Sequence, residues 1–223
     1  MKTEAKPSLI WDMDGTLVDS YPAIVANLAA ACRECGVAVT KEEIRREILT
    51  HSAVHFLINL EKKTGVPAQR IGDCYSAIAR QNSDRVLPME HAAETLEALR
   101  NAGVANYVFT HRGASAAGIL KGAGLDGYFT EIVTAEAGFR RKPDPEGIDY
   151  LVRKYGLDRS LTCYVGDRSL DIECACNAGI KSILYLPRDA VAVPTGRETL
   201  VVRDLLRIPE QLPAILRHSR PAP

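Results

Sequence analysis

Residues 8–16 have the sequence SLIWDMDGT, in which a short apolar run is followed directly by two aspartates, Asp12 and Asp14. A continuous apolar run of about 4–8 residues is typical of a buried strand. Carboxylates at the end of such a strand offer the oxygen ligands that Mg²⁺ prefers. Gly15 permits a sharp turn that brings backbone N–H groups toward a bound anion. For this motif alone, an ordinary polar turn after a strand remains an alternative.

Apolar runs alternate with helical patterns over most of the chain beyond this motif. Further strands are predicted at 104–110, 129–134, 161–165 and 182–186. One helical pattern has Asp144 as its N-cap and Pro145 at its first helical position, and it ends at Gly156. Strands that alternate with helices predict an α/β fold, a doubly wound, Rossmann-like parallel sheet covered on both faces.

Residues 19–85 interrupt this alternation, because they show only helical signals. Helices are predicted at 20–36, 41–49, 51–63 and 67–83. We therefore expect a catalytic core, 1–18 with 86–223, and an inserted all-helical cap domain, 19–85. An insert after the first strand lies where ligands bind in open α/β sheets, so it could act as a lid. The tail, 201–223, suits a docked helix, and we assign it no chemistry.

Polar residues also follow the later strands. Thr110 ends the second run, Lys142 precedes the capped helix, and Asp167 and Asp171 belong to the segment GDRSLD. Each is a weak signal alone, but the carboxyl ends of such strands meet at one crevice. Carboxylates gathered there repel one another unless a cation holds them. The sequence therefore predicts a metal site formed by Asp12, Asp14, Asp167 and Asp171.

The ordered set D-x-D-G-T, T, K-P and G-D-x-x-x-D resembles the haloacid dehalogenase-like hydrolases, within them the group with a helical cap that includes phosphoglycolate phosphatases. The resemblance implies that Asp12 attacks phosphorus and becomes an aspartyl phosphate. It implies that Asp14 protonates the leaving oxygen and then activates the hydrolytic water. Thr110 and Lys142 would hold the phosphoryl oxygens.

The resemblance also implies a cofactor and a substrate class. Mg²⁺ would be bound by Asp12, the carbonyl of Asp14 and Asp167, with Asp171 supporting it directly or through water. The expected enzyme is a phosphoric monoester hydrolase that acts on a small phosphorylated metabolite. Family members that remove halide lack an acid at the position of Asp14, which favours phosphate chemistry. A phosphomutase or phosphonate hydrolase would keep the same core and stays open.

Two other classes of protein are less compatible with the chain. A phosphorylated receiver domain has about half this length, no helical insert and its nucleophile on a later strand. A non-catalytic binding protein on the same fold would be expected to have lost Asp12 or Asp14, and both are present.

Substrate recognition is the part that the motifs leave open. His111 and Arg112 follow Thr110, and His51 and Ser52 lie in the cap segment where many relatives carry a glycine-containing loop. We consider these four residues candidates for substrate binding. As an alternative, Ser52 simply caps a helix and the histidines lie on its solvated face. Phosphoglycolate, sugar phosphates, nucleoside monophosphates and pyrophosphate all remain possible substrates.

The composition of the chain limits the kinds of partner that it can have. Its 223 residues contain 28 Lys and Arg and 28 Asp and Glu, and this zero net charge argues against a nucleic-acid partner. No apolar run approaches the ~18–20 residues of a membrane-spanning helix, and the first residues have no signal-peptide core. The spacing of the six cysteines matches no zinc-binding pattern, and no His/Cys set suggests a zinc site. Cysteines that serve as small buried apolar side chains are typical of a reducing compartment. We expect a cytoplasmic protein without a membrane partner; its oligomeric state is open, a monomer being one possibility.

Overall fold

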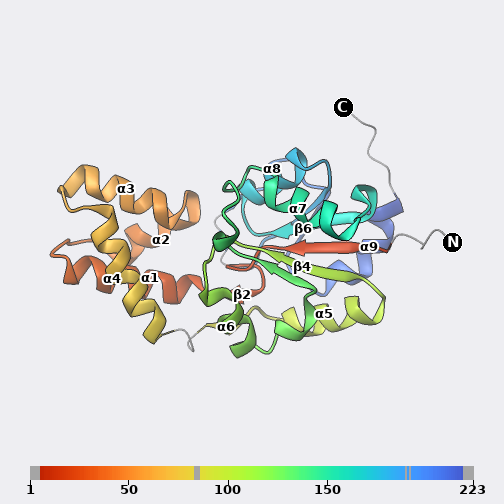
Figure 1. Cartoon of the computed structure of the whole chain (residues 1–223), viewed down its shortest axis with the longest axis horizontal. Coiled ribbons are helices and arrows are strands. Elements are labelled where there is room, and N and C mark those ends of the chain that lie inside the picture. Colours follow the sequence, from red (N-terminus) through yellow and green to blue (C-terminus); the bar gives the residue numbers. More distant parts are fainter. Residues whose placement is uncertain (1–5, 83–85, 189, 191, 218–223) are drawn as a thin grey trace. The chain divides into compact units, whose positions relative to one another are not determined.

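The computed structural model of the chain describes residues 6–82, 86–188, 190 and 192–217 (Figure 1). The chain forms two compact units, one made of 1–18 with 88–223 and the other of Asp19–Leu87. Each unit has its own buried apolar core.

The first unit is built on a six-stranded sheet with the order β5-β4-β1-β6-β7-β8, in which all neighbours are parallel. The strands are β1 (Ser8–Trp11), β4 (Ala105–Phe109), β5 (Glu131–Val133), β6 (Thr162–Gly166), β7 (Lys181–Tyr185) and β8 (Leu200–Val202). All residues of β1, β6 and β7 are buried, as expected for strands covered on both faces. The predicted doubly wound α/β class is therefore confirmed.

Helices cover both faces of this sheet (Figure 1). One face carries α7 (Glu146–Tyr155) and α8 (Ser169–Asn177). The other carries α5 (Ala92–Asn101) and α6 (Ser115–Gly122), with α9 (Arg207–Arg217) packed against α5. Short 3-10 helices lie at Asp126–Tyr128, Ala135–Ala137 and Arg159–Leu161. The chain moves outward from β1 to β5 on one face and returns to β6 on the other, which places the switch point of the topology beside β1.

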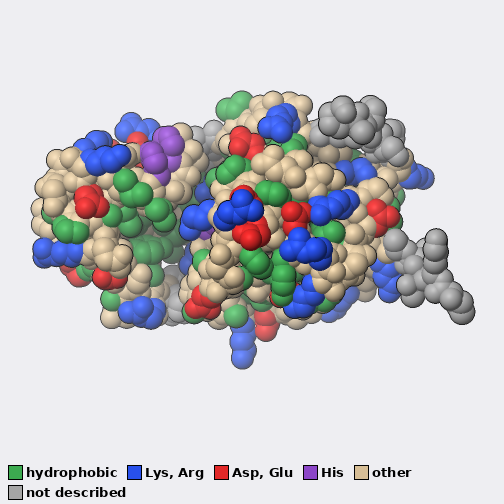
Figure 2. Space-filling model, turned by 45° about the horizontal axis from the view of Figure 1, so that its top comes forward, with side chains coloured by type: hydrophobic (Ala, Val, Ile, Leu, Met, Phe, Trp, Pro, Cys, Tyr) green, Lys and Arg blue, Asp and Glu red, His purple; other side chains and the backbone are tan. Residues whose placement is uncertain are grey.

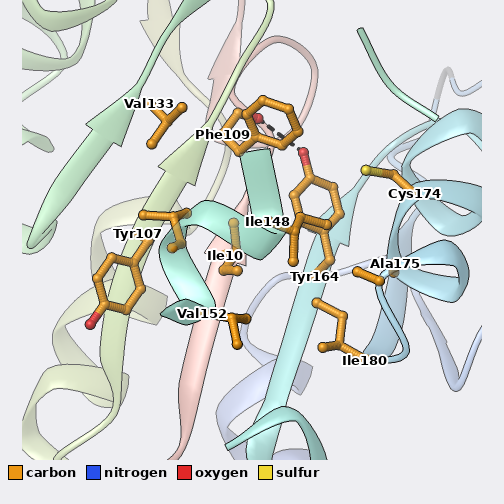
Figure 3. Packing of buried hydrophobic residues seen from close by; sticks show 12 residues of the cluster. Ile10, Tyr107, Phe109, Val133, Ile148, Val152, Tyr164, Cys174, Ala175 and Ile180 are labelled. Carbon is orange, nitrogen blue, oxygen red and sulfur yellow. Dashed lines mark hydrogen bonds between the residues drawn. The ribbon is translucent and has the colours of Figure 1, made fainter. Parts of the chain in front are cut away.

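Apolar side chains from β1, β4, β6, α7 and α8 form the core beneath this switch point (Figure 3). The rings of Phe109 and Tyr164 point toward each other, and the Tyr164 hydroxyl donates a hydrogen bond to the Phe109 carbonyl at 2.9 Å. Gly147 in α7 lies against the Phe109 ring, where an added Cβ would be only 2.4 Å from a ring carbon. Glycine at this position therefore lets α7 approach the sheet.

Two predictions for this unit need correction. The sequence suggested no strand after 182–186, but β8 pairs with β7; three residues are too short a run to show a periodicity. The helix predicted from Pro145 begins at Glu146, with Pro145 itself at the N-cap. The Asp144 carboxylate accepts the Glu146 N–H at 3.0 Å, so the capping side chain is the one expected, although the helix begins one residue later.

The second unit consists of four helices. They are α1 (Tyr21–Glu34), α2 (Lys41–Thr50), α3 (Ala53–Thr64) and α4 (Ala68–Gln81). Thr40 and Glu43 form a capping box at the start of α2, and Gly65 ends α3 with a φ of 72°. Ser83, the predicted last residue of the fourth helix, lies outside the described residues, and none of the described helices is long and apolar enough to cross a membrane. A two-stranded sheet, β2 (Val18–Asp19) with β3 (Leu87–Pro88), was not predicted, because each strand has only two residues.

Candidate active site

Asp12 lies directly after β1, and its N–H donates to the carbonyl of Val165 in β6 at 2.8 Å. Its carboxylate is buried. Oδ1 accepts a hydrogen bond from Nζ of Lys142 at 2.5 Å, whereas Oδ2 has no hydrogen-bond partner among the residues that the structure describes. Burial raises the pKa of Asp12 to about 6, although the neighbouring Lys142 ammonium opposes this rise. One oxygen of the buried carboxylate is thus held and the other is available.

Lys142 comes from the loop before α7, and its side chain is fully buried. Its Nζ also lies 2.9 Å from Oδ1 of Asp171, and it is 5.0 Å and 5.3 Å from the ring centres of Tyr164 and Phe109. Burial opposes the charge, but Asp12 and Asp171 together hold the pKa of Lys142 above its usual value. The side chain is therefore a charged ammonium held between two carboxylates and two aromatic rings.

Asp171 lies in the first turn of α8, and its Oδ2 accepts the N–H of Arg168 at 3.2 Å. Gly166, at the end of β6, is in close contact with it. A Cβ added to Gly166 would lie 2.4–2.6 Å from side-chain atoms of Asp171. Only glycine therefore allows this carboxylate to reach the end of the sheet. Asp167 is also buried, and its Oδ1 accepts a hydrogen bond from the Thr16 hydroxyl at 3.4 Å.

Oxygen atoms of Asp12, Asp167 and Asp171 lie within 4.8 Å of one another. One lysine ammonium does not balance the negative charge of three buried carboxylates. A hard divalent cation suits this all-oxygen donor set. The residues therefore fit a divalent metal ion, as the sequence predicted for these three aspartates.

The Asp14 carboxylate is oriented differently from this cluster, because it pairs with Arg112. Nε of Arg112 lies 3.1 Å and 3.2 Å from the two carboxylate oxygens, and Nη2 also donates to Oδ1. Both side chains are mostly buried. Thr110, buried at the end of β4, accepts the Arg112 N–H at 3.1 Å through its hydroxyl. Arg112, considered above as a substrate ligand, thus lies next to Asp14.

His111 supports the lysine loop. Its Nε2 accepts the backbone N–H of Lys142 at 2.9 Å, and its ring packs edge-on against Phe109. Burial, together with the nearby positive charges of Lys142, Arg141 and Arg168, lowers the pKa of His111 to about 2. A neutral imidazole therefore holds the backbone that carries Lys142.

The other two substrate-binding candidates belong to the helical unit. His51 is the C-cap residue of α2 and is exposed. Ser52 is the N-cap of α3, and its hydroxyl accepts the His55 N–H at 3.1 Å. The alternative considered for Ser52, that it caps the helix, is thus what the structure shows.

Two further residues of this site were not assigned from the sequence. Arg168 lies close enough to Asp12 to oppose the rise in its pKa, and Thr16 contacts Asp167. Thr16 stands inside the D-x-D-G-T motif, which could have identified it. Arg168 occupies a variable position of the G-D-x-x-x-D motif, so only its place between two aspartates was a signal.

The acidic cluster, the buried lysine and the threonine thus lie together at the switch point of a parallel α/β sheet, where open sheets of this kind bind their ligands. A profile of the haloacid dehalogenase-like hydrolases matches residues 9–185. A phosphoglycolate phosphatase of Agrobacterium fabrum is 30% identical over 79% of this chain and 79% of its own length. A probable phosphatase, IndB, of Dickeya dadantii is 31% identical over 80% of each chain.

A solved structure agrees on the fold. The crystal structure of a predicted phosphoglycolate phosphatase from Haemophilus somnus matches with a TM-score of 0.81 over 92% of this chain and 97% of that one, at 20% identity. The chain belongs to the haloacid dehalogenase-like hydrolases, as its motifs indicated. It is a phosphatase-type member of that family, similar to the phosphoglycolate phosphatases, and an enzyme of the phosphoric monoester hydrolase class.

Proposed function

We propose that this protein is a magnesium-dependent phosphatase that hydrolyses a small phosphomonoester through an aspartyl phosphate on Asp12. The observation that supports this most is the state of the Asp12 carboxylate. Lys142 holds Oδ1, while Oδ2 is buried without a hydrogen-bond partner among the described residues. An oxygen with unshared lone pairs in a dry site is suited to attack phosphorus.

In the first half of the reaction, Oδ2 of Asp12 forms a bond to phosphorus as the bond to the ester oxygen breaks. The Thr110 hydroxyl and the Lys142 ammonium hold the phosphoryl oxygens, because phosphoryl transfer depends mainly on positioning and charge neutralisation. Mg²⁺, bound by Asp12, the Asp14 carbonyl and Asp167 with support from Asp171, would neutralise negative charge on these oxygens.

Asp14 moves the protons. It gives a proton to the departing alkoxide and then takes one from the water that attacks the aspartyl phosphate, which releases inorganic phosphate and restores Asp12. The Asp14 carboxylate is engaged by the Arg112 guanidinium, so proton donation to the leaving group requires this pair to open. We infer that an anionic group of the substrate takes over Arg112 and leaves Asp14 able to carry the proton.

This exchange favours a small ester that has a second anionic group. Phosphoglycolate has such a carboxylate, and guanidinium groups bind carboxylates in a bidentate manner. The helical unit, predicted as a cap at 19–85, would choose among esters by contacts with the group that carries the phosphate. We also place the enzyme in the cytoplasm, an inference supported by its six free cysteines.

A panel of phosphate esters tests this proposal directly. With Mg²⁺ we expect release of inorganic phosphate, fastest from small esters with a carboxylate, and a loss of activity after exhaustive chelation that added Mg²⁺ reverses. Full activity after chelation would contradict the metal requirement. Isomerised ester without free phosphate would identify a phosphomutase instead.

A further inference from the structure

We propose that the helical unit carries a second metal site, formed by Glu47, His51 and His55, which binds a borderline transition-metal ion such as Zn²⁺. One ligand atom from each of these side chains lies within 4.8 Å of the others. Their donor types differ from those of the acidic cluster of Asp12, Asp167 and Asp171. This site goes beyond the phosphatase activity and does not depend on it.

The junction between α2 and α3 brings the three side chains together. Glu47 lies in the last turn of α2, His51 is the C-cap residue of that helix, and His55 lies in the first turn of α3. The imidazole rings of His51 and His55 are stacked, with centroids 4.3 Å apart and an interplanar angle of 23°. Nδ1 of His51 is 3.8 Å from a carboxylate oxygen of Glu47. Figure 2 shows histidine side chains (purple) gathered on the surface of the helical unit.

The donor set determines which ion fits. Two imidazole nitrogens and one carboxylate suit Zn²⁺, Ni²⁺ or Cu²⁺, whereas Mg²⁺ prefers sites made of oxygen. Bonds to Zn²⁺ are about 2.0–2.2 Å long, so ligand atoms around one tetrahedral ion lie roughly 3.3–3.5 Å apart. The side chains of His51 and Glu47 are 48% and 30% exposed, so they are free to rotate by the small amount that closes this distance.

The surroundings provide the rest of a coordination site. The Asn59 amide lies 3.2 Å from Nδ1 of His55, and after a half-turn its oxygen would accept the N–H of a ring that binds metal through its other nitrogen. Glu47 and Asn59 also line a hollow of about 170 Å³, which has room for water. The side chains of His51 and Glu47 are themselves partly exposed, so solvent water can complete the coordination of the ion.

The sequence did not reveal this site because a change of helix interrupts the spacing of its ligands. Glu47, His51 and His55 are four residues apart, as on one helix, but a change of helix separates them at Ser52. The sequence offered no His/Cys set for zinc, and only the folded arrangement brings a carboxylate and two histidines together. An ion here would connect the end of α2 to the start of α3 and make the helical unit harder to unfold.

Zinc titration of the full-length chain tests the proposal. Calorimetry with Zn²⁺ in excess Mg²⁺, which competes for the hard carboxylate site, should show one zinc ion per chain. Asn59→Ala should weaken zinc binding by about tenfold, because it removes a hydrogen-bond partner of a metal-bound histidine. Substitution of a ligand itself should weaken binding further, as in His51→Ala, His55→Ala and Glu47→Gln. Glu42→Gln, an exposed glutamate on the same helix, is the matched control and should bind zinc like the wild type. Zinc should also raise the thermal midpoint of the wild type and of Glu42→Gln, but not that of His51→Ala.

Asp167→Asn separates this site from the acidic cluster. We expect it to keep zinc binding unchanged, because its substitution lies in the other unit. The visible absorption of bound Co²⁺ should show nitrogen ligands in Asp167→Asn and lose them in His55→Ala. Absence of zinc binding, zinc binding unchanged by both histidine substitutions, or loss of zinc binding in Asp167→Asn alone would overturn the proposal. None of these outcomes bears on whether Asp12 is the nucleophile.

Discussion

The two clusters of potential metal ligands in this protein are built in opposite ways. In the sheet unit, Asp12, Asp167 and Asp171 are buried, and the fully buried Lys142 pairs with both Asp12 and Asp171. In the helical unit, His51 and His55 are exposed and the carboxylate of Glu47 is half-buried. Removal of one charge from a buried group leaves the others uncompensated, whereas water screens an exposed group. The buried cluster should therefore respond to substitution strongly and as a unit, and the exposed one weakly and locally.

The largest effect is expected from Asp12→Asn, which exchanges the proposed nucleophile for an amide of almost the same size. Turnover should fall by more than about a thousandfold, or ~4 kcal/mol in the activation free energy, because the covalent route is lost. The fold should be kept, since an amide oxygen can still accept from Lys142. Steady-state kinetics with the best ester of the panel measures the loss. Asp126→Asn, an exposed aspartate far from the motifs in sequence, serves as the control. More than about a tenth of wild-type activity would refute the nucleophile assignment.

The second prediction compares two lysines. Lys142→Met should lower the free energy of unfolding by about 3–5 kcal/mol, because it leaves buried carboxylates without their counter-charge. Lys154→Met removes an exposed lysine that pairs with Glu131 at 2.8 Å, and it should cost much less, because water screens an exposed pair. Urea unfolding in chelator measures both values, and Mg²⁺ should recover part of the loss in Lys142→Met only. Equal losses for the two variants would show that the buried carboxylates do not depend on the charge of Lys142.

The main elements of the first cluster could be predicted from the sequence because each belongs to a strand end. The run before Asp12 and the motifs around Thr110 and Asp167 are local signals, and the doubly wound topology brings such ends together. The Arg112 pair with Asp14 and the contact of Gly166 with Asp171 could not be predicted in this way. They depend on how loops and helices pack in three dimensions, which no periodicity records.

The second cluster shows the same limit in a stronger form. His51 and Ser52 were considered as substrate ligands, and the helix predicted at 51–63 placed His51 and His55 one turn apart; α3 instead begins at Ala53, and the two rings stack across its start. The stacking results from the backbone at the α2–α3 junction, where α2 ends at its C-cap residue His51 and α3 begins after its N-cap residue Ser52. A spacing of four residues predicts contacts within one helix, so it did not connect Glu47 in α2 to His55 in α3.

The third prediction concerns pH and uses two histidines with opposite shifts. The pKa of His111 is lowered to about 2, so between this pH and about 6.5 the unfolded chain binds a proton that the folded protein does not. Stability should thus fall as pH falls below about 6.5, by up to ~1.4 kcal/mol per pH unit from this residue. His111→Gln, which keeps an acceptor for the Lys142 N–H, should make the stability of the protein less dependent on pH in this range.

His91 provides the comparison of opposite sign. A hydrogen bond with Asp204 raises its pKa above the usual value, so its contribution to stability is present at pH values below about 6.5 and is lost as the pH rises. His91→Asn should therefore remove stability mainly at low pH. Urea unfolding between about pH 4.5 and 7.5 measures both slopes. If His111→Gln and the wild type have the same slope, the imidazole is not held neutral by burial.

The smallest expected effect is on the choice of substrate, and it concerns His51. The core motifs contact only the phosphoryl group and the metal, which all esters share, so discrimination requires groups that touch the rest of the substrate. We expect His51→Ala to change the relative rates of esters in the panel by about tenfold or less, since one hydrogen bond contributes ~0.5–1.5 kcal/mol. A small aryl phosphate should be affected little, and Glu42→Gln should leave the order of esters unchanged.

The assay needs Mg²⁺ in zinc-free buffer, with a parallel series in added zinc, because an ion bound to His51 would occupy the imidazole that the substrate uses. If zinc abolishes the preference of the wild type but has no effect on His51→Ala, the same side chain serves both roles. A uniform change across all esters, or none, would show that this histidine does not select the substrate.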